Sequence, residues 1–320
     1  MDMIHVRAVC PPDLTQRTMS LLGDEPCALN LVLQTGSVRN PDGDAIECDV
    51  LTGAANEVLR GLRDLGLERH GSIALDPVDT LFSEHAARTG AEQLGALPSA
   101  PVWAQVEARI RAEGRYPPSF YLFLVIAGLI GAVGIITNSQ ILIVAAMVVG
   151  PEYGAITSVA LAIDRGSRPR IRQGLSALLV GFVLAVAATF LFSLLVRGFG
   201  LQPRAFELGV RPVSNLINTP NFFSAVVAVL AGVVGIVSLA EARTSALLGV
   251  FISVTTIPAG ADIGVSCAFG SWDEAWGSLL QLLLNIVVLI LVGTGTLKCQ
   301  RAIWRRVGER RHRREVRRTA

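Results

Sequence analysis

The chain has 320 residues, of which 51% are hydrophobic and 17% are charged, and its mean hydropathy is +0.51. A chain this apolar is neither an ordinary soluble domain nor a disordered segment, so the composition predicts an integral membrane protein. The formal net charge of +2 hides an uneven distribution, since most charged residues lie in a polar leading segment up to Arg115 or in an arginine-rich tail that begins at Lys298.

The leading segment lacks a secretory signal pattern, because no basic start is followed by a short apolar run and a small-residue cleavage site. We therefore expect it to stay in the cytoplasm. The cysteines are scattered, with no CxxC pair and no histidine at ligand spacing, and we expect free thiols. His5 and His70 could coincide on neighbouring strands, but lone strand histidines are more often packed residues than metal ligands. We predict neither a metal nor a cofactor.

Residues 1–77 predict a small α+β domain. Alternating apolar residues indicate strands, and apolar residues at helical spacing indicate helices, the last of which stops at Gly66. We expect strands at 3–10, 27–38, 44–51 and 71–75, and helices at 13–22 and 52–65. The order βαββαβ is that of the ferredoxin-like split motif. Such a domain could bind a small ligand, pair with a copy of itself or play no chemical role, and the residues do not choose among these.

Residues 78–119 are interpreted as a linker followed by an amphipathic helix. The stretch 97–101 is rich in proline and small residues, as is typical of linkers. Residues 102–115 predict a basic helix with Trp103, Val106 and Ile110 near one face. This helix could lie on the membrane surface or pack on the soluble domain as a connector, and both alternatives stay open.

Hydropathy predicts six membrane-spanning helices in a domain that covers residues 120–297. The spans are expected at 120–137, 141–163, 174–196, 222–240, 246–267 and 278–297. Short basic loops lie on the cytoplasmic side of membranes, so the arginines at 165–172 and the basic tail 298–320 orient both termini toward the cytoplasm. The acidic loop 269–277 then faces outward. The discordant residues are Arg197, Arg204 and Arg211. We expect the tail to contact anionic lipid rather than nucleic acid.

Two halves of this membrane domain resemble each other. Gly131-Ala-Val-Gly134 in the first span is matched by Gly232-Val-Val-Gly235 in the fourth. Each of these spans precedes a helix that contains a proline and, soon after it, an acid. Three spans separate the copies, so the sequence predicts an inverted repeat of three plus three helices in which the second and fifth helices are broken.

The predicted breaks carry the candidate functional residues. Proline interrupts a helix, and an ionisable side chain inside a bilayer is a functional-site hypothesis by default. Glu152 and Asp262 have no cationic partner within the spans, so each could take up a proton or lie beside a cation. The expected pathway adds the backbone at the breaks and polar lining, namely Gly150, Pro151, Pro258, Gly260, Thr255, Thr256 and Asn285. The alternative for Thr255, Thr256 and Asn285 is hydrogen bonding between helices. Close helix packing is the expected role of a separate set of glycines, namely Gly128, Gly131, Gly134, Gly232 and Gly235.

The segments IVAAMVVGPEYGAI and SVTTIPAGADIGV resemble the two proline-containing segments of a bacterial family of hydrophobic membrane proteins described as domain of unknown function 389. The resemblance covers about 120–297, and the alternating N-terminal domain also fits such proteins. Glu152-Tyr153 departs from the Leu-Met usual in the family, and Ala259-Gly260 replaces a second proline. The resemblance implies the architecture and a bacterial cytoplasmic membrane, but it implies no activity.

Three classes of function stay open. The broken helices and buried acids favour a transporter or channel for a small solute or ion, coupled to protons or cations. A sensor or oligomeric scaffold with a regulatory N-terminal domain is the alternative, and in either case we expect a homo-oligomer. An intramembrane hydrolase is disfavoured, because the aspartyl proteases of this kind carry two aspartates in Tyr-Asp and Gly-x-Gly-Asp settings that this chain lacks. We predict no enzymatic activity.

Overall fold

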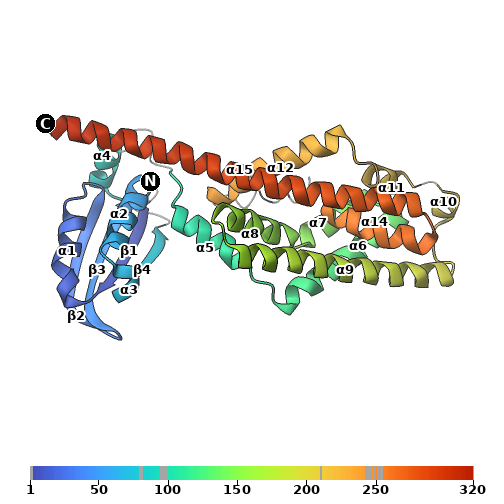
Figure 1. Cartoon of the computed structure of the whole chain (residues 1–320), viewed down its shortest axis with the longest axis horizontal. Coiled ribbons are helices and arrows are strands. Elements are labelled where there is room, and N and C mark those ends of the chain that lie inside the picture. The colour runs from blue at the N-terminus through green and yellow to red at the C-terminus, as the bar shows by residue number, and fades with distance from the viewer. Residues whose placement is uncertain are drawn as a thin grey trace. The chain divides into compact units, whose positions relative to one another are not determined.

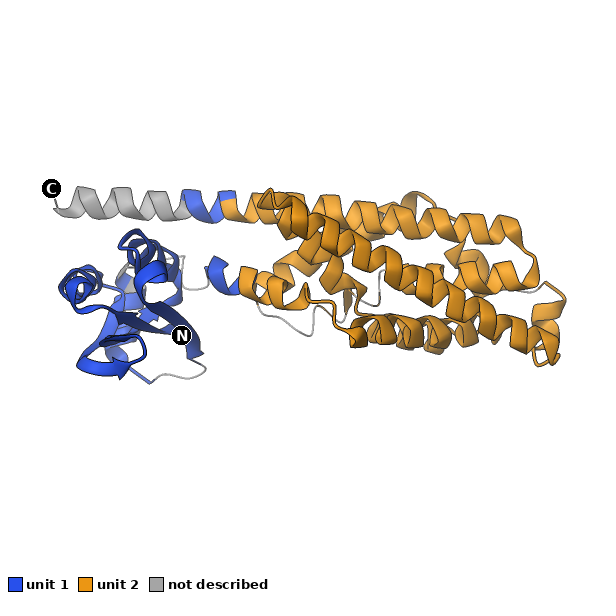
Figure 2. Cartoon of the chain, turned by 60° about the horizontal axis from the view of Figure 1, so that its bottom comes forward, with its two compact units in different colours: residues 1–106, 302–320 blue, residues 107–301 orange. Residues whose placement is uncertain are grey.

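The computed structural model describes residues 3–78, 82–93, 100–209, 211–241 and 255–319, together with positions 247, 249, 250 and 252. The chain divides into two compact units (Figure 2). The first, the N-terminal unit, comprises residues 1–106 and 302–320, and the second, the helical unit, comprises residues 107–301.

The N-terminal unit is built on a four-stranded antiparallel sheet with the strand order β2-β3-β1-β4 (Figure 1). Its strands are β1 (Met3–Cys10), β2 (Ala28–Arg39), β3 (Asp42–Leu51) and β4 (Ser72–Val78). Its first helices are α1 (Pro12–Gly23), α2 (Thr52–Asp64) and the one-turn α3 (Leu67–His70). The predicted order βαββαβ is therefore confirmed, with α3 as an addition before β4.

The core of this unit lies on one face of the sheet. Val6 of β1 and Ile46 of β3 are buried together with Val58 and Leu62 of α2, as strand and helix periodicity require. The opposite face is polar, and there His5 Nδ1 lies 2.9 Å from Asp49 Oδ1. The predicted stop at Gly66 is confirmed, since that residue has a φ of +81°, a conformation that glycine adopts without strain.

The region between the sheet and the first apolar helix contains two helices. Helix α4 (Glu84–Gln93) precedes the stretch 97–101 that is predicted to be a linker, most of which lies outside the described residues. Helix α5 (Trp103–Glu113) confirms the helix expected at 102–115. Val106, Glu107 and Ile110 of α5 are buried in the protein. Their burial shows that this face of α5 is covered by other residues of the protein.

The helical unit contains long apolar helices and shorter helices between them. They are α6 (Pro118–Ile136), α7 (Gln140–Val149), α8 (Glu152–Asp164), α9 (Arg168–Gly198), α10 (Arg204–Glu207), α11 (Pro212–Ile217), α12 (Phe222–Ala240), α14 (Thr256–Phe269) and α15 (Trp272–Thr319), the last of which continues into residues of the N-terminal unit. Four of the described helices are long and apolar enough to cross a membrane, and α7 with α8, bent by 48°, gives a fifth candidate. Many of their apolar side chains are exposed, such as Leu179 and Leu191, as expected for lipid-facing residues.

These helices account for five of the six expected spans. The helices expected at 120–137, 174–196, 222–240 and 278–297 correspond to α6, α9, α12 and α15. The break expected near Gly150 in the second span is confirmed by the bend between α7 and α8. The fifth expected span, 246–267, begins in residues that lie largely outside the described part of the chain, and its second half is α14.

The break expected at 257–262 is not where the sequence placed it. Helix α14 begins at Thr256 and runs without interruption through Pro258 and Asp262 to Phe269. The physical reason is that Pro258 occupies the first turn, where a backbone N–H has no partner within the helix and its loss costs nothing. Pro258 and Gly260 therefore lie inside a regular helix, and the start of that helix is two residues before the proline.

Two of the three discordant arginines, Arg197 and Arg211, make contacts within the helical unit. Arg197 donates to the carbonyl of Ala268 near the end of α14, at 2.7 Å. Arg211 packs over the ring of Phe206 and lies 3.0 Å from Glu274, with its side chain only 12% exposed. These two charges are thus paired or bonded within the protein, which explains how a loop opposite the basic end can contain them.

Candidate functional site at two helix starts

The sequence Gly150-Pro151-Glu152 separates α7 from α8. Gly150 has extended backbone geometry at the end of α7, Pro151 precedes the first turn of α8, and Glu152 is the first residue of that helix. Proline cannot continue α7, because it lacks the N–H that would bond to the preceding turn. The interruption therefore places the carboxylate of Glu152 at a helix start, where the partial positive charge of the first turn favours an anion.

A second helix starts beside this one. Thr256 is the first residue of α14, and its hydroxyl donates a hydrogen bond to Glu152 Oε1 at 2.6 Å. Ile257 packs against Gly150 so closely that a Cβ at that glycine would lie 2.6 Å from Ile257 Cγ1. Glycine at position 150 is thus required by the approach of α14, and the two helix starts form one site.

The carboxylate of Glu152 is buried yet incompletely satisfied. Glu152 is 6% exposed, and its Oε2 atom has no hydrogen-bond partner among the described residues. A buried acceptor without a partner carries a penalty of about 1–3 kcal/mol, and more for a charged group. The atom is therefore a candidate for binding a proton or a cation, either of which removes that penalty.

A polar network from α15 adjoins the site. Asn285 Nδ2 donates to Thr255 Oγ1 at 3.0 Å, and Gln281 Nε2 donates to Asn285 Oδ1 at 3.2 Å. Gln281 Oε1 is a second buried acceptor without a partner among the described residues. The structure therefore brings together Gly150, Pro151, Glu152, Thr255, Thr256 and Asn285, which come from three of the expected spans.

Asp262 belongs to a different cluster. Its two carboxylate oxygens accept hydrogen bonds from Ser214 of α11 at 2.8 Å and from Ser278 of α15 at 2.6 Å. The residue is fully buried, and the hydrogen bonds described for it share no residue with those of Glu152. Asp262 is thus a satisfied buried acid, whereas Glu152 is an incompletely satisfied one. Sequence reasoning missed both serines, since single serines in apolar helices carry no distinguishing signal.

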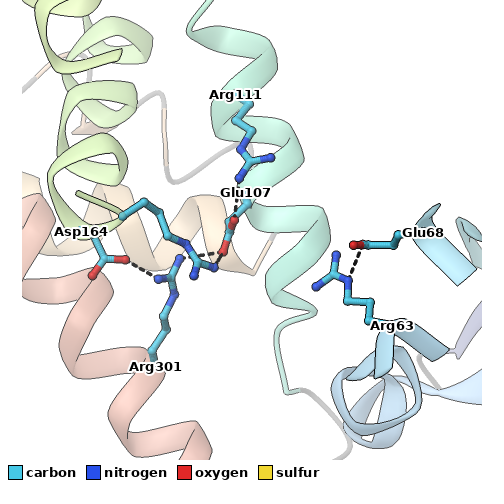
Figure 3. Close-up of polar contacts among 7 residues, drawn as sticks. Arg63, Glu68, Glu107, Arg111, Asp164 and Arg301 are labelled. Atoms are coloured by element: carbon cyan, nitrogen blue, oxygen red, sulfur yellow. Dashed lines mark hydrogen bonds and ion pairs between the residues drawn. The ribbon is translucent and has the colours of Figure 1, made fainter. Parts of the chain in front are cut away.

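A third polar cluster was also missed from the sequence. Glu107 of α5 accepts from Arg111 at 3.2 Å and from Arg301 at 2.9 Å, and it contacts Arg165 as well (Figure 3). Arg301 also contacts Asp164, the last residue of α8. The i, i+4 spacing of Glu107 and Arg111 was the available signal. These contacts tie α5, α8 and α15 together at one end of the helical unit.

The fold and these sites define a helical membrane protein with an N-terminal four-stranded α+β domain. Residues 147–291 match the family described as "Domain of unknown function (DUF389)". This match includes the prolines of both proline-containing segments and confirms the resemblance drawn from them.

One curated relative is described as an uncharacterised protein. It is a protein of Methanocaldococcus jannaschii that is 21% identical over 170 residues, which are 53% of this chain and 50% of the relative. The chain thus spans about half the length of the curated relative that it matches. No solved structure matches the chain. Within the described residues, no group of three or more histidine, cysteine or acidic side chains is placed to hold a metal ion.

Proposed function

We propose that the protein is a membrane transporter or channel for a small solute or ion, in which Glu152 couples movement to a proton or cation. The observation that carries this proposal is the buried Glu152 carboxylate, held by Thr256 between two helix starts with Oε2 unpartnered among the described residues. Interrupted helices that meet around a polar group are the usual architecture of transporter sites. A proton or a cation at Glu152 Oε2 would give this buried oxygen the partner that it lacks among the described residues.

The helix contacts support an inverted repeat of three plus three helices. In the first half, Gly131 of α6 lies so close to α14 that a Cβ added at this glycine would be 3.0 Å from the Cβ of Ala261. In the second half, Gly235 of α12 lies against α8 at the Tyr153 hydroxyl. Each glycine-rich helix thus has a contact with the helix that starts near a proline in the other half, as a two-fold relation between the halves would produce.

The distribution of arginines supports an orientation for six spans. Contacts of Glu107 and Asp164 place Arg111, Arg165 and Arg301 at one end of the helical unit. Arg197 of α9 donates a hydrogen bond to the Ala268 carbonyl. Arg211, which precedes α11, forms an ion pair with Glu274. By the positive-inside rule the arginine-rich end faces the cytoplasm, and with six spans both termini lie on that side.

The test is flux through reconstituted vesicles. Purified protein is placed in liposomes, and proton, sodium and potassium movement is followed under imposed gradients for the wild type and for Glu152→Gln. Glutamine keeps the shape and the acceptor for Thr256 but cannot be ionised, so we expect coupled flux to fall by about tenfold or more, as for loss of an essential ionisable group. Glu68→Gln, at an exposed ion pair of the N-terminal unit, is the matched control and keeps its flux.

Two outcomes would overturn the proposal. One is a folded Glu152→Gln protein with the same flux as the wild type at every gradient. The other is a wild-type protein that moves none of these ions and shows no gradient-driven uptake of small solutes. An Asp262→Asn protein separates the two acids, because Asp262 is already satisfied by Ser214 and Ser278 and is expected to affect folding more than coupling.

A further inference from the structure

A cleft of about 310 Å³ opens at the arginine-rich end of the helical unit. It lies where the end of α5 meets α8 and the beginning of α9. Four arginines line it, namely Arg111, Arg115, Arg165 and Arg170, and no acidic residue of the described chain is among its lining. The turn between α8 and α9 passes through Gly166, whose φ of +65° lets the chain reverse there and present arginines on both sides.

The arginines around this cleft outnumber the acids that neutralise them. Arg111 and Arg165 share one carboxylate, that of Glu107, which also serves Arg301. Asp164 supplies a second carboxylate to Arg301. Arg115 and Arg170 are exposed and have no ion-pair partner among the described residues. The cleft therefore keeps positive charge that the protein itself does not compensate.

The remaining lining suits an anion with several oxygens. Ser158, Ser167 and Gln173 add neutral hydrogen-bonding side chains, and the Tyr116 ring forms part of the wall. Arginine binds tetrahedral oxyanions through paired N–H donors, and serine hydroxyls complete such sites. A groove that shares Gln173 with the cleft continues along α9 past Arg168 and Arg172. The exposed Leu175 and Leu179 follow on the same helix.

We infer that this cleft binds a phosphate-bearing anion through Arg115 and Arg170, with Arg111 and Arg165 held in position by Glu107. The phosphate could belong to a lipid headgroup or to a soluble phosphate ester, and both present the same oxyanion to the arginines. The inference is independent of Glu152, which lies in the hydrogen-bonded site formed with Thr256. It assigns a ligand class to the arginine-rich end of the helical unit.

The experiment uses the full chain and compares two arms, the first in detergent and the second in nanodiscs. In the first arm, inorganic phosphate and glycerol phosphate are titrated calorimetrically. In the second, phosphatidic acid or phosphatidylglycerol is added to phosphatidylcholine nanodiscs that hold the protein, and bound lipid is counted by native mass spectrometry. The test variant is Arg115→Gln with Arg170→Gln. The control is Arg168→Gln with Arg172→Gln, which removes the same charge from the adjacent groove.

We expect the test variant to lose about tenfold or more in affinity in at least one arm, since two charge-assisted contacts are removed. The control is expected to lose distinctly less. Arg115→Lys with Arg170→Lys keeps the charge and should recover part of the affinity, which also guards against a variant that does not fold. A loss confined to the nanodisc arm assigns a lipid headgroup, and one confined to the titration assigns a soluble ester. Equal affinities for test variant and wild type, or equal losses in test and control variants, would overturn the inference.

Discussion

The hydroxyl of Thr256 lies 2.6 Å from the carboxylate of Glu152, and this bond joins the starts of two helices that are 104 residues apart in the sequence. The start of α14 stabilises the start of α8, because the Thr256 hydroxyl donates a hydrogen bond to one oxygen of the buried Glu152 carboxylate. In the proposed mechanism, this contact would transmit the binding of a proton or cation at Glu152 to α14. Its removal therefore gives the most direct test of how the two halves are coupled.

Thr256→Val is expected to lower the stability of the helical unit. Valine matches threonine in shape but leaves Glu152 Oε1 without its donor, and an unsatisfied buried acceptor costs about 1–3 kcal/mol. The measurement is the thermal unfolding midpoint of the protein in detergent, read from helical circular dichroism. Thr256→Ser keeps the hydroxyl and should recover most of the loss. If valine and serine variants unfold at the same temperature as the wild type, the bond does not stabilise the site.

Gly235 and Tyr153 form a second contact between the halves. A side chain at Gly235 would meet the Tyr153 hydroxyl, so Gly235→Ala must displace the ring. Overpacking of this kind costs about 1–3 kcal/mol. We expect Gly235→Ala to lower the unfolding midpoint, and Tyr153→Phe in the same chain to relieve part of the loss by removing the nearest atom. A double variant no more stable than Gly235→Ala would place the strain elsewhere.

The sequence predicted the interrupted second helix and much of the candidate site, because proline and an acid in an apolar segment have few structural solutions. Asn285, Thr255 and Thr256 were foreseen as polar lining. Thr256 bonds to Glu152, and Asn285 bonds to the neighbouring Thr255. The separation of Asp262 from Glu152 was not foreseen, since proximity to a proline does not reveal which helix face an acid occupies. The serines around Asp262 and the role of Glu107 depend on tertiary packing, which a single sequence does not report.

Glu107 is expected to stabilise the protein far more than an exposed acid does. Its side chain is 11% exposed and faces three arginines, whereas the Arg63–Glu68 pair is half exposed on both sides (Figure 3). Removing one partner from a buried ion cluster costs about 3–5 kcal/mol, whereas exposed pairs are worth about 0–1 kcal/mol. We therefore expect Glu107→Gln to lower the unfolding midpoint strongly and Glu68→Gln to leave it nearly unchanged. Similar shifts for the two variants would contradict the structural role of the cluster.

Asp44 gives the N-terminal unit a dependence on pH. Hydrogen bonds from the Thr15 hydroxyl at 2.5 Å and from the Gly36 amide at 2.7 Å hold the pKa of this carboxyl below its usual range. A lowered pKa in the folded state stabilises the fold above the unfolded value of about 3.9, and the contribution is lost as the pH falls through the folded value. The bonds should therefore protect the bulged β2 segment near Gly36 at neutral pH and weaken in acid.

Hydrogen exchange of the intact protein, followed by mass spectrometry, measures this protection. Asp44→Asn removes the charge, so peptides that cover residues 34–44 should exchange faster than in the wild type at pH 7, after correction for intrinsic rates. As the pH falls through the lowered pKa that Asp44 has in the folded protein, the wild-type carboxyl takes up its proton and the difference between the two proteins should disappear. Thr15→Val should accelerate exchange at pH 7 in the same way, because it removes one of the two donors. A difference that persists unchanged into acid would show that the Asp44 charge does not hold the bulge.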